Sequence, residues 1–261
     1  MVKKPQIPVQ FRYYDMPPNR FVFALLGESW RRNYGGDISE LHFHNFLEIG
    51  ICREGGGTLV IEGQNLPYHD NMLSVLPQNT LHTTNSGEQG ICFWEYLFVD
   101  VEGFFRTYYR DDVRKAEHMA ANVAKAAWLL TGEEALPLYR LVEAIMEEER
   151  DRKHNSSEVT NGILCALLLL IARKNVGASD VPAGNYSKMR RIMDALRYLE
   201  LHYQNEMAIE TIASVCHMSE THFRRQFRAC MHMTPLAYLN FLRVEKACEL
   251  LRRTDYSLEL I

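Results

Sequence analysis

The segment from Ile209 to Phe227 constrains this chain most, because two short helical patterns there flank a brief interruption. In the first pattern, apolar or small residues recur with the spacing of one buried helical face, at Ile209, Ile212, Ala213 and Cys216. The dipeptide that follows forms a corner, and Ser219 is placed to cap a second helix at its N-terminus. Phe223 and Phe227 anchor that helix one turn apart, so the segment predicts a helix-turn-helix.

The second helix carries a polar face opposite its two phenylalanines. This face contains Thr221, His222, Arg224, Arg225 and Arg228. Arginine pairs well with guanine edges and phosphates, so a helix of this kind reaches into the major groove of double-stranded DNA. We therefore predict that these five residues bind DNA. The alternative is a merely solvated polar face, and for His222 a packing or capping role is equally consistent.

The composition fits a soluble globular protein of two domains, with 261 residues, 47% apolar and 24% charged. The net charge of −4 is divided unevenly. Residues 187–261 carry 11 basic and 9 acidic residues, a net charge of +2, whereas residues 1–186 carry a net charge of −6. A basic module joined to an acidic one agrees with a DNA-binding C-terminal part.

No membrane or secretion signal is expected. The longest apolar run, 163–172, is about half of the roughly 18 residues of a membrane span. The N-terminus has two lysines but no apolar core behind them. The six cysteines form no CxxC pair and lie inside apolar patterns, which indicates reduced, buried side chains. We expect a cytoplasmic protein with no membrane partner.

Before this C-terminal part, the chain changes to short β-type runs. Residues 1–20 hold four of the nine prolines and are predicted to form an extended arm rather than packed structure. From residue 21 to 99 we expect strands at FVFALLGE, LEIGICR, GTLVIEG, MLSVL, LHTT and ICFWEYLFV. Six or more short strands with frequent turns favour a sandwich or barrel.

Polar residues in this β region follow a definite spacing. The first set is Gly36, His42, His44, Glu48 and Gly55, and a second set has Pro77 followed by His82. These residues resemble the two motifs of the cupin family, which are small jelly-roll barrels with inward-pointing histidines and glutamate. The second motif is degraded, with Asn71 and Asn79 where that family usually has glycines, although asparagine tolerates left-handed turns.

Three roles are open for the polar cluster His42, His44, Glu48 and His82. Three imidazoles and one carboxylate suit a divalent transition metal. The same groups can hydrogen-bond a polyol, or they can be satisfied core residues. Trp30, Trp94 and Tyr96 could stack on a sugar face, although core packing is the simpler role for each. Both faces of ICFWEYLFV are apolar, so the sequence does not say which face points inward.

Helical patterns follow the strands. An amphipathic stripe at residues 138–146 predicts one helix, and Ser156 or Ser157 is expected to cap a second through ILCALLLLIARK. That helix is apolar on nearly all sides and must be covered, for which a partner subunit is a natural solution. Residues 176–186 read as a flexible linker. Beyond it, residues 189–203 form a helical pattern, and Thr234-Pro235 predicts the start of a long helix.

This order of elements, with the string IAxxxHMSxxHFRRQF…TPxxYLxxxRxxxAxxLL, resembles the AraC-type (AraC/XylS) family of bacterial transcription regulators. The resemblance covers almost the whole chain. His232 departs from it, since family members usually have a glycine there. The resemblance to this family implies an α+β protein with four parts. Residues 1–110 are expected to form an arm and a cupin-like jelly-roll barrel for an effector, and residues 111–176 a helical dimerisation segment. Residues 177–186 are expected to be a linker, and residues 187–261 an all-α helix-turn-helix domain.

Members of that family carry two helix-turn-helix units, and here Ser257–Ile261 resembles only the opening turn of the second. The DNA-binding domain is therefore expected to be incomplete. A single unit contacts few phosphates, so we expect weak, salt-sensitive DNA binding unless a homodimer supplies a second copy.

The leading hypothesis is a transcription regulator, not an enzyme, that responds to a small molecule in the barrel. The resemblance implies a carbohydrate or related metabolite as effector, and no cofactor beyond the metal considered above. A second hypothesis is a metal-dependent cupin enzyme with a vestigial DNA-binding domain. A third is a dimerising protein that no longer binds operators by itself.

Overall fold

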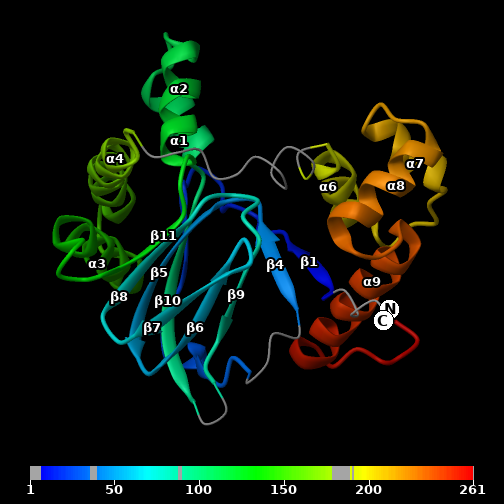
Figure 1. Cartoon of the computed structure of the whole chain (residues 1–261), viewed down its shortest axis with the longest axis horizontal. Coiled ribbons are helices and arrows are strands. Elements are labelled where there is room, and N and C mark those ends of the chain that lie inside the picture. Colours follow the sequence, from blue (N-terminus) through cyan, green and yellow to red (C-terminus); the bar gives the residue numbers. More distant parts are fainter. Residues whose placement is uncertain (1–6, 36–39, 88–89, 178–188, 190, 261) are drawn as a thin grey trace. The chain divides into compact units, whose positions relative to one another are not determined.

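A computed structural model of the chain describes residues 7–35, 40–87, 90–177, 189 and 191–260. Gly36 of the first polar motif and most of the expected linker lie outside the described residues. The chain divides into two compact units, one formed by Tyr14–Pro182 and one formed by Met1–Tyr13 with Ala183–Ile261 (Figure 1). We call them the barrel unit and the DNA-binding unit.

The barrel unit contains two antiparallel sheets. Its strands are β2 (Val22–Leu25), β3 (Arg31–Arg32), β4 (Leu41–His44), β5 (Leu47–Glu54), β6 (Gly56–Ile61), β7 (Gln64–His69), β8 (Met72–Leu76), β9 (His82–Asn85), β10 (Cys92–Val99) and β11 (Trp128–Thr131), with a 3-10 helix η1 (Glu28–Trp30). One sheet has the order β4-β9-β6-β7, and the other has the order β11-β8-β5-β10-β2, with β3 also paired to β10. All six predicted strand runs are confirmed, and the cupin-like barrel is the fold.

The alternation of β5 and β10 settles which side chains point inward. Cys52, Trp94, Tyr96 and Phe98 belong to the core inside the barrel, whereas Ile49, Ile51, Leu97 and Val99 belong to the core outside it. Because successive residues of a strand point to opposite faces, both faces of this strand pair are covered. The interior face was the one that the sequence could not assign.

Four helices share a core with the outer face of the larger sheet. In Figure 1, α3 and α4 lie beside this sheet, and α1 and α2 rise beyond its upper end. They are α1 (Val101–Tyr108), α2 (Val113–Val123), α3 (Leu136–Asp151) and α4 (Ser156–Lys174). α1 and α2 begin at Asp100 and Asp112, whose carboxylates accept hydrogen bonds from the backbone N–H groups of Gly103 and Lys115. α1 and α2 were not predicted individually from the sequence, and each buries two side chains, Phe104 and Phe105 in α1 and Ala116 and Val123 in α2.

α4 differs from its prediction in its N-cap residue and in the length of its apolar stretch. The residue that caps it is Asn155 in a left-handed conformation, not Ser156 or Ser157, because Ser156 is already helical and buried. By length and composition α4 could cross a membrane, with a mean hydropathy of 1.3, a feature that the shorter apolar run did not indicate. A core helix passes the same test, and α4 packs against α2 and α3.

In the residues that the structure describes, the DNA-binding unit has one strand and several helices. It contains β1 (Val9–Arg12), α6 (Met193–His202), α7 (Ile209–Val215), α8 (Glu220–Met231) and α9 (Pro235–Arg253). α7 and α8 form the predicted helix-turn-helix around Phe223 and Phe227, both with 0% exposure. Thr234 caps α9 by accepting a hydrogen bond from the Ala237 N–H, as predicted. Ser219 is the N-cap residue of α8, but its side chain makes no capping hydrogen bond.

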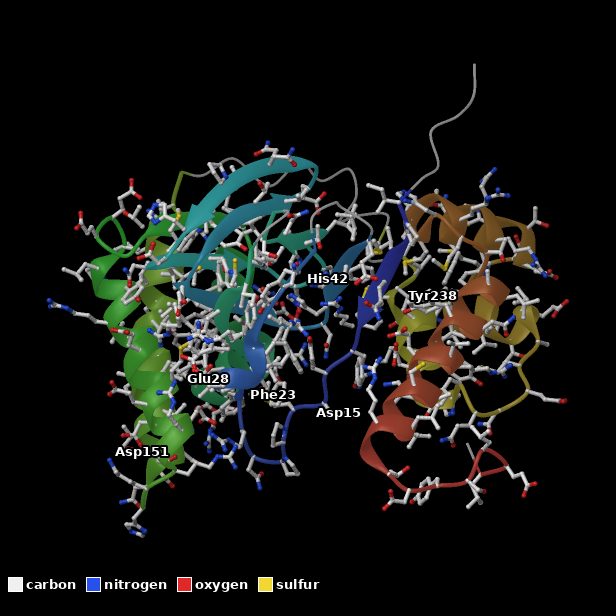
Figure 2. The ribbon with its side chains drawn as sticks, turned by 90° about the horizontal axis from the view of Figure 1, so that it is seen from below. Asp15, Phe23, Glu28, His42, Asp151 and Tyr238 are labelled. Atoms are coloured by element: carbon white, nitrogen blue, oxygen red, sulfur yellow. The ribbon has the colours of Figure 1, made fainter. Side chains whose placement is uncertain are left out.

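The described part of the N-terminal arm is packed through Val9 and Phe11, so the prediction of unpacked structure was wrong for this part. The side chains of Val9 and Phe11 are buried, and β1 lies against α8. The Ile7 carbonyl is 2.8 Å from Nδ1 of His232. Tyr238, which is labelled on α9 in Figure 2, donates a hydrogen bond to the Phe11 carbonyl at 3.4 Å. The prolines that suggested an irregular arm flank a short apolar alternation, which forms the strand.

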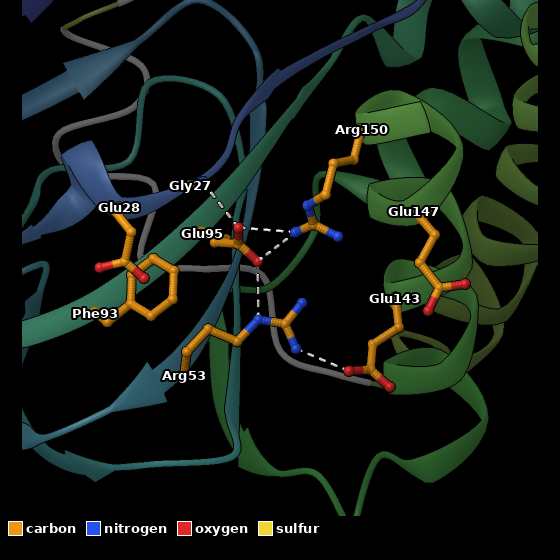
Figure 3. Close-up of a pocket in the computed structure, with 8 residues that line it drawn as sticks. All are labelled: Gly27, Glu28, Arg53, Phe93, Glu95, Glu143, Glu147 and Arg150. Atoms are coloured by element: carbon orange, nitrogen blue, oxygen red, sulfur yellow. Dashed lines mark hydrogen bonds and ion pairs between the residues drawn. The ribbon is translucent and has the colours of Figure 1, made fainter. Parts of the chain in front are cut away.

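One buried carboxylate joins α3 to the barrel. Glu95 on β10 accepts hydrogen bonds from the Gly27 N–H, from Nε of Arg53 on β5, and from Arg150 on α3, at 2.9 to 3.0 Å (Figure 3). Burial alone would raise the pKa of Glu95, but these donors and the two guanidinium charges outweigh burial and lower it.

We predict that Glu95→Gln destabilises the protein at neutral pH by about 2–4 kcal/mol, since it leaves two guanidinium groups without their carboxylate. The folded-state pKa of Glu95 is lowered, so its contribution is present above the unfolded-state pKa of about 4.3 and is lost as pH falls through the folded-state value. Thermal unfolding between pH 3 and 7 should therefore show a smaller acid-induced decrease for the variant. Glu147→Gln, a change at an exposed residue nearby, serves as control, and equal pH profiles for E95Q and wild type would contradict the prediction.

Candidate functional site

Four polar residues predicted from the sequence meet inside the barrel. His42 and His82 are directly paired on β4 and β9, and their ring centroids are 4.2 Å apart. Nε2 of His44 lies 3.2 Å from one oxygen of Glu48, and Nε2 of His82 lies 3.7 Å from the other. Exposure of the four residues ranges from 0% to 8%. We call them the His/Glu cluster, and their convergence agrees with the cupin-like spacing.

The backbone fixes which nitrogen of two imidazoles carries the proton. Nδ1 of His44 is 2.7 Å from the Phe46 carbonyl, and Nδ1 of His82 is 2.9 Å from the Thr80 carbonyl. A carbonyl oxygen only accepts, so each Nδ1 must donate. The Nε2 atoms of the neutral rings therefore present lone pairs to the carboxylate of Glu48, which is itself an acceptor. The side-chain geometry brings three acceptors together at a buried point.

Such a set of acceptors calls for a proton, a metal ion or a ligand with donor groups. Burial lowers the pKa of His44, which disfavours a proton there, although the carboxylate of Glu48 opposes that effect. His44, His82 and Glu48 offer three ligand atoms within 4.8 Å of one another. Two imidazoles held by Nδ1–carbonyl contacts, together with a carboxylate, fit a divalent transition metal, which would neutralise the acceptors. Hydroxyl groups of a polyol could supply the missing donors equally well.

The three predicted aromatic residues lie together in the same interior. The rings of Trp94 and Tyr96 are stacked, with centroids 5.9 Å apart and an interplanar angle of 8°. Trp30 meets Tyr96 edge-on at 5.9 Å. Trp94 and Tyr96 are buried and Trp30 is half-buried. All three make packing contacts of the kind that was the simpler expectation, and their stacking on a sugar face stays a prediction.

A second polar site was not predicted from the sequence. An open cleft of about 430 Å³ lies between the outer face of the larger sheet and α3 (Figure 3). Its lining residues are Gly27, Glu28, Arg53, Phe93, Glu95, Glu143, Glu147 and Arg150. Arg53 donates to both Glu95 and Glu143, so its charge is already neutralised within the cleft. The sequence feature that could have indicated this cleft is Glu95, a single charged residue within an otherwise apolar strand.

The predicted DNA-binding residues share the solvent face of α8. Thr221, Arg224, Arg225 and Arg228 are exposed and His222 is half-buried. Nε of Arg224 donates to Glu220 at 2.6 Å, and a terminal nitrogen of Arg225 is 3.3 Å from Nδ1 of His222. An exposed ion pair between residues one helical turn apart contributes little stability. The guanidinium groups of Arg224 and Arg225 are therefore available to an anionic partner.

A barrel with an inward-facing polar cluster and a helix-turn-helix on the same chain define a transcription regulator with a ligand-binding domain. Residues 30–163 match the AraC-like ligand binding domain, and residues 212–261 match a helix-turn-helix domain. The chain belongs to the AraC family of transcription regulators. It is not an enzyme, so the metal-dependent enzyme considered above is set aside.

Several relatives are transcriptional activators. The chain is 27% identical over 216 residues to the HTH-type transcriptional activator RhaS of Citrobacter koseri, which covers 83% of this chain and 75% of that protein. It is 26% identical over 219 residues to RhaS of Salmonella arizonae, with the same coverage. Among solved structures, ToxT from Vibrio cholerae O395 aligns with a TM-score of 0.43 and 12% identity, over 85% of this chain and 96% of that one. The AraC-like activator CuxR aligns with a TM-score of 0.37 and 17% identity, over 78% and 67%.

We predict that Glu48→Gln stabilises the ligand-free protein by about 1 kcal/mol, because it removes a buried negative charge that faces two acceptor nitrogens. The amide has the same shape, carries no charge, and supplies N–H donors to an acceptor nitrogen of His44 or His82. Urea unfolding of chelator-treated protein measures the change. A clear loss of stability in E48Q would contradict the prediction, because it would mean that a protonated imidazole is paired with Glu48.

The same variant tests the metal. Wild-type protein and E48Q are each treated with a chelator and then titrated with Zn²⁺, Ni²⁺ or Mn²⁺. A metal ion held by the His/Glu cluster raises the unfolding temperature of wild type and has little effect on E48Q. Elemental analysis of the purified protein gives the stoichiometry.

Proposed function

We propose that this regulator binds a carbohydrate or related polyol in the barrel, beside the His/Glu cluster, and that this ligand changes its affinity for double-stranded DNA. The observation that carries the proposal is the surplus of buried acceptors at His44, His82 and Glu48. Sugar hydroxyl groups donate hydrogen bonds, and an unpaired buried acceptor gives a favourable place for them. The nearby rings of Trp30 and Tyr96 suit the apolar face of a sugar.

The DNA-binding part of the proposal assigns base and phosphate contacts to α8. Thr221, Arg224 and Arg225 are assigned to bases, while His222 and Arg228 are assigned to the DNA backbone. Exposure of the arginines and their spacing along one helical face support this assignment. We further propose a cytoplasmic location, where the protein can reach the bacterial chromosome, and no membrane partner.

Coupling between ligand and DNA requires two states that differ in ligand affinity. The arm could transmit such a change, because residues 7–12 contact α9 and the end of α8 and the chain then continues directly into the barrel unit. A ligand that alters the start of the barrel changes the strain on the arm. The contacts of Ile7 with His232 and of Phe11 with Tyr238 are the ones that such a change would act on.

We predict that a sugar that binds the barrel changes DNA affinity by at least about fivefold, the lower end of ordinary coupling free energies. DNA that binds the protein is first selected from a random duplex pool, and its affinity is measured by fluorescence anisotropy with and without each sugar of a panel. Arg224→Ala with Arg225→Ala should abolish DNA binding and leave sugar binding unchanged. If sugars bind but none shifts DNA affinity, the regulatory part of the proposal fails.

We also propose a homodimer formed through α4. Its buried side faces α2 and α3, while Val159, Ile163, Ala166 and Leu170 form a stripe along the other side that is exposed or half-buried. Val159 is 43% exposed. The stripe is apolar and includes small residues, which allows two copies of the helix to approach closely. The same stripe on a second copy of the chain can cover it, because a twofold axis brings identical surfaces into contact.

We predict that Ala166→Glu converts the dimer to a monomer, because it places a carboxylate in the centre of an apolar interface. Ser157→Glu, at an exposed position in the first turn of the same helix and outside the stripe, should leave the dimer intact. Analytical ultracentrifugation over a range of concentrations distinguishes the two species. A wild-type protein that stays monomeric at high concentration would refute the interface.

A further inference from the structure

Two neighbouring arginines on β3 point to opposite faces of the larger sheet. Arg31 is paired with Phe93 and Arg32 with Cys92. Paired residues of neighbouring strands share a face, and Cys92 belongs to the core inside the barrel. Arg32 therefore points to the interior side, at the rim of the barrel, whereas Arg31 lies over the ring of Phe93 on the outer side.

The two arginines also differ in their charge partners. Arg31 forms ion pairs with Glu28 and Glu54 at 2.8 and 2.5 Å. Among the residues that the structure describes, none forms an ion pair with Arg32. Its guanidinium carbon is instead 4.7 Å from the ring centroid of Trp30 and 4.8 Å from that of Tyr34. Stacking on both rings positions the guanidinium group of Arg32, which also forms a side-chain hydrogen bond with Tyr34. A guanidinium group has five N–H donors, so this one hydrogen bond leaves donors for a ligand.

A line of polar groups leads from Arg32 to the His/Glu cluster. The hydroxyl group of Tyr34 donates a hydrogen bond to the Trp30 carbonyl at 3.0 Å. Burial raises the pKa of Tyr34, and its hydrogen bond with Tyr96 and the charge of Arg32 act against that increase. Burial likewise raises the pKa of Tyr96, and the charges of Glu48 and Arg32 both act on that phenol. Tyr34 and Tyr96 thus stand between an exposed cation and a buried carboxylate.

We propose that Arg32 receives a carboxylate group of the effector, so that the ligand class is a sugar acid rather than a neutral sugar. This inference rests on the proposed function. The carboxylate pairs with the guanidinium edge of Arg32, and the hydroxyl groups extend along Tyr34 and Tyr96 to the acceptors of the His/Glu cluster. A phosphate group fits less well, because its second negative charge would face one guanidinium group with Glu48 beyond it.

The test compares hexuronates with neutral sugars of the same configuration: D-galacturonate with D-galactose, and D-glucuronate with D-glucose. Calorimetry and the fluorescence of Trp30 and Trp94 report binding. We expect at least one acid to bind about tenfold or more tightly than its neutral counterpart, as a charge-assisted pair contributes. The methyl ester of the same acid should lose that advantage without any change to the protein.

Variants at the two arginines provide the matched comparison. Arg32→Gln should reduce the preference for the acid by about tenfold, while Arg31→Gln should leave it unchanged, since Arg31 already has two carboxylate partners. Thermal unfolding checks that both variants fold. Neutral sugars that bind as well as their acids, or an equal loss in both variants, would overturn the inference and leave the proposed function standing. If neither acids nor neutral sugars bind, both are overturned.

Discussion

The pairing of β5 with β10 is the interaction on which the barrel unit depends. Its register places Glu48 opposite Phe98, Gly50 opposite Tyr96 and Cys52 opposite Trp94, all on the inner face. The alternate residues of both strands face the helical layer. If β5 slipped by one residue against β10, its inward and outward side chains would be exchanged, which would move Glu48 away from the histidines of β4 and β9 and turn Ile49 and Ile51 into the barrel. The register of β5 and β10 therefore determines both the position of Glu48 inside the barrel and the packing of the helices on the outer face.

Gly50 shows how closely that inner face is packed. A side-chain carbon at this position would lie 2.7 Å from Oγ of Ser74 and 3.1 Å from the rings of both Trp94 and Tyr96. The absence of a side chain lets the two aromatic residues stack in parallel beside β8. The interior thus combines a tightly filled aromatic half with a polar half around Glu48, and the rim formed by Trp30, Arg32 and Tyr34 adjoins both. Such a division suits recognition of a ligand that has one apolar face and several hydroxyl groups.

Much of this arrangement could be predicted from the sequence, for physical reasons. Local patterns predicted six of the strands and the helix-turn-helix, and motif spacing predicted the convergence of His42, His44, Glu48 and His82. The strands β4, β7 and β11 were not predicted. The inward face of β10 could not be read, since helices cover one side and the barrel interior the other. The Glu95 network, the packed arm and the different environments of Arg31 and Arg32 depend on residues distant in sequence. No local pattern contains that information.

His232 illustrates how one residue can serve two purposes that conflict. It ends the recognition helix with φ of 59°, a left-handed conformation in which a glycine would be less strained by roughly 1 kcal/mol. Its ring also meets the Ile7 carbonyl of the arm, which a glycine could not do. The chain therefore accepts a local conformational cost at the one turn where the DNA-reading helix and the arm meet. A glycine at this position would relieve the turn but remove the ring that meets the arm, so the stability of the turn and the attachment of the arm make opposite demands on one residue.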